Sequence, residues 1–586
     1  MPDPSVSALN HRARAFGAGL LHALLLGLSF PPVGWWFLAF IAPLPLFWVA
    51  KNPGRSVVGA GFWAMIGVAP FWVWSHAWVS SISVAGVYPL VVYLSLHTWV
   101  FVVAGHRALR GPIPGAFVLA IVWCGIEFFR GAIGWSGYPW YMLGHPMIDS
   151  ANAALAWPAA VGGVTLVSML VALPPAWLAT RRAGDGHGDR EGGRATAIAI
   201  GTLCVVWVAW AILRPTAAES DIQPFRVGVV QTNVPQDNRI DWSTAQRLDD
   251  WLTMRAQTER VAASDPAPDV IVWPEGLVPG WTLDPVALDL ERSRAIVWHV
   301  RPESEAQARR LAAYPSRTPA TLVVDEILEM QRSLGVPMLL GAVAYDNLRI
   351  VNGDTGLVYE NDALYNSAFL VQNGRVGDVW YDKVHLTPFG EIMPYISAWP
   401  WLEESLLSFG AQGMAFVLDP ARSVKTIPLF LPGDRSVEMA TPICFEATMP
   451  GVCRRLANVA HRTGRPVVLI NMTNDGWFAG SDRGRGMHAH AARWRCVELG
   501  VPMVRVANTG VSGSIDRFGR VMGSLPPREA GEAVFPVVPG VPSTVYARLG
   551  EWTGWGAMLG LVGLMWLGGG RNSRLGERSA EECGKG

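Results

Sequence analysis

The sequence WYDKVHLTPFGE, residues 380–391, places Lys383 and Glu391 eight positions apart in a segment rich in turn-forming residues. Two further reactive side chains end apolar runs: Glu275 follows VIVWP, and Cys444 follows MATPI. Together these groups can form a thiol nucleophile. Glu275 would accept the proton of Cys444, and Lys383 would stabilise the thiolate and later the oxyanion. The pattern therefore predicts a covalent acyl-transfer centre.

The chain around these residues has the pattern of an α/β domain. From Phe225 onward, short β-rich runs alternate with amphipathic helical stretches. This alternation predicts a mixed sheet with helices packed on its faces, an α/β sandwich. Glu275, Cys444 and Asn474 each directly follow a β run, and strand ends are where such sheets place their chemistry. The predicted strands are 226–231, 270–273, 338–344, 367–371, 438–443, 467–472 and 503–507, and the predicted helices are 246–262, 325–335, 451–463 and 488–500.

The composition of the whole chain is that of a membrane protein. Of 586 residues, 51% are hydrophobic and only 16% are charged. The 28 tryptophans gather near the ends of apolar runs, as interfacial tryptophans do. Lys+Arg and Asp+Glu both total 47, so net charge gives no reason to expect a nucleic-acid partner.

Apolar runs long enough to cross a bilayer predict eight spans, seven before the α/β domain and one after it. Basic residues such as Lys51 and Arg107 occupy alternate loops, so the positive-inside rule places the N-terminus in the cytoplasm and the α/β domain outside it. We therefore expect a membrane domain at 1–214, an extracytoplasmic catalytic domain at 215–545, and a last helix with a cytoplasmic tail at 546–586. The predicted spans are 15–33, 34–50, 57–79, 85–105, 114–133, 158–180, 195–213 and 552–569.

Three cysteines fall in the exported domain, an odd number for an oxidising compartment. Cys444 follows the turn-forming Pro442 and precedes a helix-like stretch, a geometry expected to aim backbone N–H groups at the sulfur and to lower its pKa. Cys453 and Cys496 could form a disulfide or be buried separately, and we favour burial.

Other polar residues have two interpretations each. Glu391 and Glu446 could cap helices, or could orient Lys383 and the substrate. Glu127 and Arg130 lie three apart in a predicted span, either as a structural ion pair, which we favour, or as a contact to a lipid headgroup. His488 and His490 have no third ligand at metal spacing, so we predict no metal site and no cofactor.

Several segments together resemble the nitrilase (carbon–nitrogen hydrolase) superfamily and, within it, the bacterial apolipoprotein N-acyltransferase family. The resemblance covers nearly the whole chain, and the membrane part contributes Glu127, Arg130 and the segment GYPW at 137–140. The matching segments of the α/β domain are Pro274-Glu275, Tyr365-Asn366-Ser367, 381–391, Cys444-Phe445-Glu446, 474–478, 495–500 and 505–510.

This resemblance implies an αββα nitrilase sandwich with Cys444 as nucleophile, Glu275 as general base and Lys383 as oxyanion stabiliser. It implies transfer of an acyl chain from a phospholipid, through a cysteine thioester, to the amine of a diacylated apolipoprotein. It also implies a multi-pass, monomeric protein of the bacterial inner membrane, with the catalytic domain on the periplasmic side. Glu391, Glu446 and Asn366 lie in matching segments, whereas Trp242 is slightly displaced from a family tryptophan.

The chain departs from the family pattern beside two of these residues. Phe445 stands where the family usually has tyrosine, and Val384 replaces a frequent arginine. Both departures bear on the choice of donor or acceptor.

Two other interpretations of the function stay open at this stage. One is a membrane-anchored amidohydrolase of a small C–N substrate, and the other is a transporter or lipid-binding protein with a decayed enzyme domain. Apolar, glycine-containing segments at 396–416 and 477–487 suit a mobile lid that dips into lipid, although ordinary packed loops would have the same composition. The predicted membrane spans favour acyl transfer over hydrolysis of a small C–N compound, because a small polar substrate needs neither spans nor apolar loops.

Overall fold

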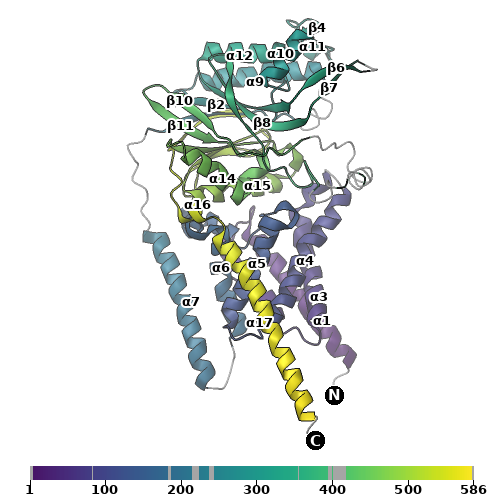
Figure 1. Ribbon diagram of the computed structural model, residues 1–586, viewed down its shortest axis with the longest axis vertical. Helices are drawn as coiled ribbons and strands as arrows, with labels where there is room; N and C mark the ends of the chain where they lie inside the picture. Colours follow the sequence, from purple (N-terminus) through teal and green to yellow (C-terminus); the bar gives the residue numbers. More distant parts are fainter. Residues whose placement is uncertain are drawn as a thin grey trace. The chain divides into compact units, whose positions relative to one another are not determined.

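The computed structural model describes residues 4–81, 84–181, 187–213, 223–235, 243–353, 356–393, 399, 401 and 418–583. Its chain forms two compact units (Figure 1). One unit contains the described residues up to Leu213 together with those from Thr544 onward. The other contains the described residues between these two stretches.

The first unit is helical. The helices α1 and α3 approach so closely that a Cβ atom on Gly67 would lie 2.2 Å from the backbone oxygen of Phe16. Small residues allow this approach, as in many packed helix pairs of membrane proteins. The helices are α1 (Pro4–Ser29), α2 (Leu44–Lys51), α3 (Val57–Ser75), α4 (Val84–Ala108), α5 (Gly115–Phe128), α6 (Ala159–Thr180), α7 (His187–Leu213), α16 (Val545–Leu549) and α17 (Trp552–Cys583).

Five stretches of the described chain are helical, long and apolar enough to cross a membrane. The predicted span 34–50 is instead divided into a short 3₁₀ helix, Trp36–Phe40, and α2. Pro43 and Pro45 lie at the start of α2, where a missing N–H is tolerated, and they separate the two pieces. The count of eight spans stays a prediction. The five stretches are Val57–Ser75, Gly86–Ala108, Gly115–Ser136, Ala159–Thr180 and Gly193–Leu213.

The second unit is a four-layer αββα sandwich, which confirms the predicted nitrilase-like fold. Its first sheet has the strand order β16-β1-β2-β5-β8-β9, and its second sheet has the order β10-β11-β12-β13-β14-β15. The helices α9 (Thr244–Ala262) and α12 (Leu322–Leu334) cover the first sheet, and α14 (Pro450–His461) and α15 (Asp482–Leu499) cover the second (Figure 1). The first sheet contains β16 (Gly531–Val537), β1 (Phe225–Gln231), β2 (Val270–Val272), β5 (Met338–Asp346), β8 (Ala363–Gln372) and β9 (Arg375–Asp382). The second sheet contains β10 (Ile427–Leu431), β11 (Arg435–Ala440), β12 (Val467–Thr473), β13 (Met503–Ala507), β14 (Ser512–Ile515) and β15 (Val521–Leu525).

The central strands are buried on both faces, because each sheet lies between helices and the other sheet. Every residue of β12 and β13 is buried. In the first sheet, β8 and β9 form a hairpin around Asn373-Gly374, both with positive φ, as two-residue hairpin turns require. The register of this pair shifts between Phe369 and Val371, so the turn and this irregularity together set the position at which Lys383 leaves the sheet.

Candidate active site

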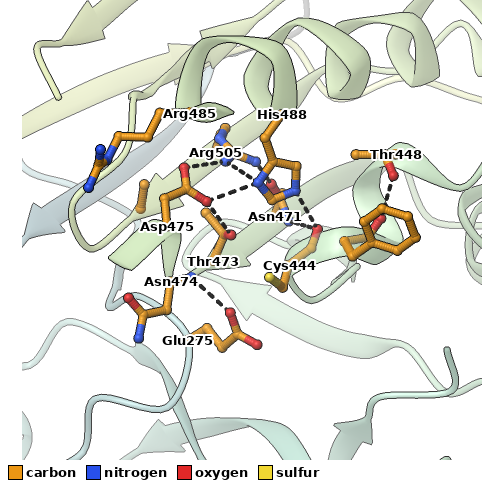
Figure 2. Close-up of polar contacts among 12 residues, drawn as sticks. Glu275, Cys444, Thr448, Asn471, Thr473, Asn474, Asp475, Arg485, His488 and Arg505 are labelled. Atoms are coloured by element: carbon orange, nitrogen blue, oxygen red, sulfur yellow. Dashed lines mark hydrogen bonds and ion pairs between the residues drawn. The ribbon is translucent and has the colours of Figure 1, made fainter. Parts of the chain in front are cut away.

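Three strand ends bring the predicted catalytic residues together. Glu275 follows β2, and Lys383 follows β9, both in the first sheet. Cys444 begins the short 3₁₀ helix η7 (Cys444–Thr448), just after β11 of the second sheet. The site therefore lies where the two sheets of the sandwich meet, and Figure 2 shows Cys444 with its sulfur on the side of Glu275.

Glu275 is held by three donors from different parts of the chain. Its Oε1 accepts a hydrogen bond from Asn366 Nδ2 at 2.7 Å and lies 3.4 Å from Lys383 Nζ. Its Oε2 accepts a bond from the backbone N–H of Asn474 at 2.8 Å. The carboxylate is buried and oriented by these bonds, as a general base must be.

Lys383 is fully buried between two carboxylates. Its Nζ lies 2.8 and 2.7 Å from the two carboxylate oxygens of Glu391, in addition to the contact with Glu275. Burial opposes the charged ammonium, but the charges of Glu391 and Glu275 outweigh it and raise the pKa of Lys383. The ammonium therefore stays protonated and can stabilise negative charge on a substrate oxygen.

Glu391 orients this ammonium. One of its oxygens accepts a bond from the backbone N–H of Thr387 at 2.7 Å, which fixes the carboxylate relative to the loop that carries Lys383. Burial acts to raise the pKa of Glu391, but Lys383 outweighs it and the pKa is lowered. Of the two interpretations from sequence, the contacts favour the orienting one.

Cys444 is half-buried and has a backbone φ of 52°, a conformation that non-glycine residues rarely adopt. Burial, followed by the negative charge of Glu275, raises the pKa of the Cys444 thiol more strongly than Lys383 lowers it. The expectation of a lowered thiol pKa is therefore wrong, because desolvation outweighs the short helix that follows. A thiol that stays protonated needs a base to become a nucleophile, and the buried Glu275 carboxylate is the candidate for that role.

Glu446 joins the segments that carry Lys383 and Cys444. Its Oε1 accepts bonds from the backbone N–H groups of Val384 and His385 at 2.8 and 2.9 Å, and its Oε2 accepts one from Ile443 N at 2.9 Å. The hydroxyl of Tyr381 donates to both oxygens, at 3.0 and 2.9 Å. Glu446 therefore both caps η7 and holds the Lys383 loop, so the two interpretations from sequence apply together.

The two departures from the family pattern fit this local packing. Phe445 is buried and stacks on His385, with ring centroids 6.2 Å apart and an interplanar angle of 18°. Val384 contributes its backbone N–H to Glu446. Neither position disturbs the contacts among Glu275, Lys383 and Glu391.

Sequence reasoning missed a buried polar network on the far side of Cys444 from Glu275. Asp475 accepts bonds from Arg505 Nη2 at 2.7 Å and from Thr473 Oγ1 at 3.0 Å, and lies 2.9 Å from His488 Nδ1 (Figure 2). Asp475 and Arg505 fall within recognised segments, but their pairing requires the register of β12 and β13. His488 was considered only as a metal ligand, whereas the structure places it against Cys444.

The remaining expectations concern residues away from the triad. Cys453 and Cys496 are buried and not bridged, which confirms separate burial. In the helical unit, Glu127 Oε1 accepts a bond from Leu143 N at 2.6 Å, and Arg130 Nη2 donates to Tyr141 O at 3.3 Å. Both side chains are buried, and these bonds go to the backbone and not from one side chain to the other, so the ion pair stays a prediction.

Trp242 and nearly all of segment 396–416 lie outside the described residues. In the segment 477–487, Phe478 is buried and packs edge-on against His488, with the two ring centroids 5.8 Å apart. These contacts favour a packed loop in this segment. Among the described residues, no group of three potential ligands is arranged to hold a metal ion.

Comparison with known proteins agrees with this fold. Residues 226–538 match the family described as carbon-nitrogen hydrolase, and residues 22–176 match the apolipoprotein N-acyltransferase N-terminal domain. Relatives named apolipoprotein N-acyltransferase include one from Geobacter metallireducens, 26% identical over 93% of this chain and 94% of that protein. Another, from Sinorhizobium medicae, is 29% identical over 86% of each.

Among solved structures, an amidase from Nesterenkonia sp. matches with 16% identity and a TM-score of 0.31, over 57% of this chain and 96% of that one. The family match spans more than half of the chain and coincides with the sandwich unit, and the N-terminal match coincides with the helical unit. The family resemblance seen in the sequence is thus confirmed. The chain belongs to the carbon–nitrogen hydrolase family, in the branch that joins this domain to an apolipoprotein N-acyltransferase N-terminal domain.

Proposed function

We propose that this protein is an apolipoprotein N-acyltransferase that uses Cys444 to carry an acyl chain from a phospholipid to a lipoprotein amine. The observation that supports this most is the buried cluster of Glu275, Lys383 and Glu391 beside Cys444, in a chain that also has the acyltransferase-type helical domain. The names of the relatives supply the substrate class.

The first half-reaction forms a thioester. Glu275 accepts the thiol proton of Cys444, the sulfur attacks the ester carbonyl of a phospholipid, and the resulting oxyanion is stabilised by Lys383. The ester C–O bond then breaks, and Glu275 returns the proton to the departing oxygen, which leaves as a lysophospholipid. The acyl chain remains on Cys444 as a thioester.

The second half-reaction regenerates the thiol. The amine of the diacylglyceryl-cysteine attacks the thioester carbonyl, and Glu275 accepts the proton that the amine loses. The C–S bond breaks, an amide forms, and Glu275 reprotonates the sulfur of Cys444. Because Glu275 takes up and returns one proton in each half, a single base is sufficient for the full cycle.

The test is single-turnover acylation of the purified full chain with phospholipid alone. Mass spectrometry should find one fatty-acyl adduct on Cys444, which disappears when a diacylated lipopeptide is added. Cys444→Ala should form no adduct, and Cys453→Ala is the matched control because Cys453 is buried and unbridged. Absence of an adduct on the wild-type chain would contradict the proposal and favour an amidohydrolase of a small substrate.

The proposal also places the sandwich unit on the periplasmic side of the bacterial inner membrane, as the alternation of basic loops predicts. The exposed residues Asp434 and Arg55 lie in the sandwich unit and in the loop between α2 and α3. In a background without the six native cysteines, Asp434→Cys should react with a membrane-impermeant maleimide on intact spheroplasts. Arg55→Cys should react only after permeabilisation, and the reverse result would overturn the orientation.

A further inference from the structure

His488 lies in direct contact with the backbone of Cys444. Its Nε2 is 3.2 Å from the Cys444 carbonyl oxygen, and the ring is buried (Figure 2). The other groups that face the ring are Asp475, with Oδ1 2.9 Å from Nδ1, and Arg505, with Nη2 3.1 Å from Nδ1. The ring of Phe478 packs against it edge-on.

The contact with Cys444 assigns one ring proton. The Cys444 carbonyl oxygen can only accept a hydrogen bond, so the contact requires a proton on Nε2. Nδ1 faces both the Asp475 carboxylate, an acceptor 2.9 Å away, and Arg505 Nη2, a donor 3.1 Å away, so these two partners do not assign its proton. Arg505 is itself fixed by Asp475 at 2.7 Å and by Asn471 Oδ1 at 2.5 Å. Burial, followed by the charge of Arg505, lowers the pKa of His488, while Asp475 and the Cys444 carbonyl act to raise it.

Cys444 needs such a partner because of its backbone conformation. A non-glycine residue at a φ of 52° is strained and persists only where its surroundings fix it. Asn471 Nδ2 donates to Pro442 O at 2.9 Å and reaches Cys444 O at 3.5 Å, and Glu446 accepts from Ile443 N. The bonds to Pro442 and Ile443 hold the backbone just before Cys444. Of the two contacts to the Cys444 carbonyl oxygen, the one from His488 is the shorter.

We propose that His488, anchored by Asp475 and Arg505, is a positioning residue that holds the Cys444 peptide in its left-handed conformation and so keeps the sulfur within reach of Glu275. This inference rests on the proposed role of Cys444 as the nucleophile. His488 touches no reacting atom, and its effect passes through the backbone of Cys444. A misplacement of about 1 Å at a nucleophile can reduce the rate by about 100-fold.

Three substitutions separate positioning from packing. A glutamine at 488 can place an amide donor near the position of Nε2, an asparagine can reach only the position of Nδ1, and a phenylalanine keeps the ring volume without donors. Therefore His488→Gln should retain the bond to Cys444, whereas His488→Asn and His488→Phe should lose it. The asparagine and glutamine variants are both polar, which makes them a matched pair.

Two measurements on the full chain test the idea. The rate of alkylation of Cys444 by iodoacetamide is followed against pH, and acylation of Cys444 by phospholipid vesicles is followed in a single turnover. In the asparagine and phenylalanine variants, we expect acylation to fall by about 100-fold and the alkylation profile to differ from that of the wild type, because the sulfur has moved relative to Glu275 and Lys383. The glutamine variant should keep the wild-type profile and acylate within about 10-fold of the wild-type rate.

The thermal unfolding midpoint of each variant shows whether a change in its alkylation or acylation rate only reflects a loss of folding stability. Wild-type alkylation profiles in all three variants would overturn the proposal, and so would a glutamine variant as impaired as the asparagine one. If the wild-type chain forms no acyl adduct, the proposed function fails. The alkylation profiles still decide the role of His488 in that case, because alkylation needs no acyl donor.

Discussion

At the scale of single residues, Glu446 shows how a buried carboxylate can build a site without touching the reacting atoms. Backbone N–H groups of Ile443, Val384 and His385, together with the Tyr381 hydroxyl, all donate to it. Its carboxylate thus joins the segment before the nucleophile to the segment after Lys383. Burial raises the pKa of Glu446 to about 7, although the bond from Ile443 N and the charge of Lys383 act in the opposite direction.

The raised pKa predicts a specific dependence of stability on pH. The folded state holds the Glu446 proton more tightly than the unfolded chain, whose value is about 4.5, so this contribution is complete below about 4.5 and is lost as pH rises through about 7. Its full size is about 3 kcal/mol. Glu446→Gln cannot titrate at this position. The unfolding midpoint of the wild type minus that of Glu446→Gln should therefore fall between pH 5 and pH 7.5. A rise in the wild-type midpoint relative to that of the variant over this range would contradict the raised pKa of Glu446.

At the scale of elements, strand β5 packs directly against the segment that carries Glu275, the proposed general base. A Cβ atom on Gly341 would lie 2.6 Å from Gly276 N, 2.7 Å from Pro274 O and 2.9 Å from the Cα of Glu275. All three are backbone atoms, which cannot rotate away as the end of a side chain can. Glycine is therefore required at this position so that β5 and the Glu275 segment can approach closely.

Replacing Gly341 by alanine should push Glu275 away from its donors. We expect a loss of about 1–3 kcal/mol in the free energy of unfolding, as for other overpacked sites. The rate of Cys444 acylation should fall by about 100-fold, because Glu275 moves relative to the thiol.

Gly486→Ala serves as the control, since a Cβ atom there meets nothing within 4 Å in α15. It should stabilise the helix by about 0.5–1 kcal/mol and leave acylation unchanged. Equal acylation rates in the two variants would show that the contact at Gly341 does not control the base.

The elements themselves were largely predictable, because periodicity is a local property of the sequence. The predicted strand 503–507 agrees with the structure. Contacts that depend on register were not predictable: the Asp475–Arg505 pair joins the end of β12 to a neighbouring strand. The thiol pKa was predicted in the wrong direction, because the extent of burial at Cys444 is set by distant segments. The division of 34–50 into two helices had a visible signal in Pro43 and Pro45.

At the scale of the whole molecule, the described chain combines a helical unit with a sandwich unit, each of which matches its own family. Within the sandwich, the proposed catalytic groups are divided between the sheets: Glu275 and Lys383 follow strands of the first, and Cys444 follows a strand of the second. Polar bonds that join the two sheets near the site include Asn474 N to Glu275, those to Glu446, and those from Thr232 and Val234 to Asn508.

This division has a consequence for how the protein should fail on warming. Each sheet keeps its own ladder of hydrogen bonds when it slides over the other, but a small slide already separates sulfur from carboxylate. Acylation of Cys444 should therefore vanish several degrees before the circular-dichroism signal of the strands declines. If the acylation rate and the circular-dichroism signal decline at the same temperature, the two sheets unfold as one cooperative unit and the active site is not disrupted first.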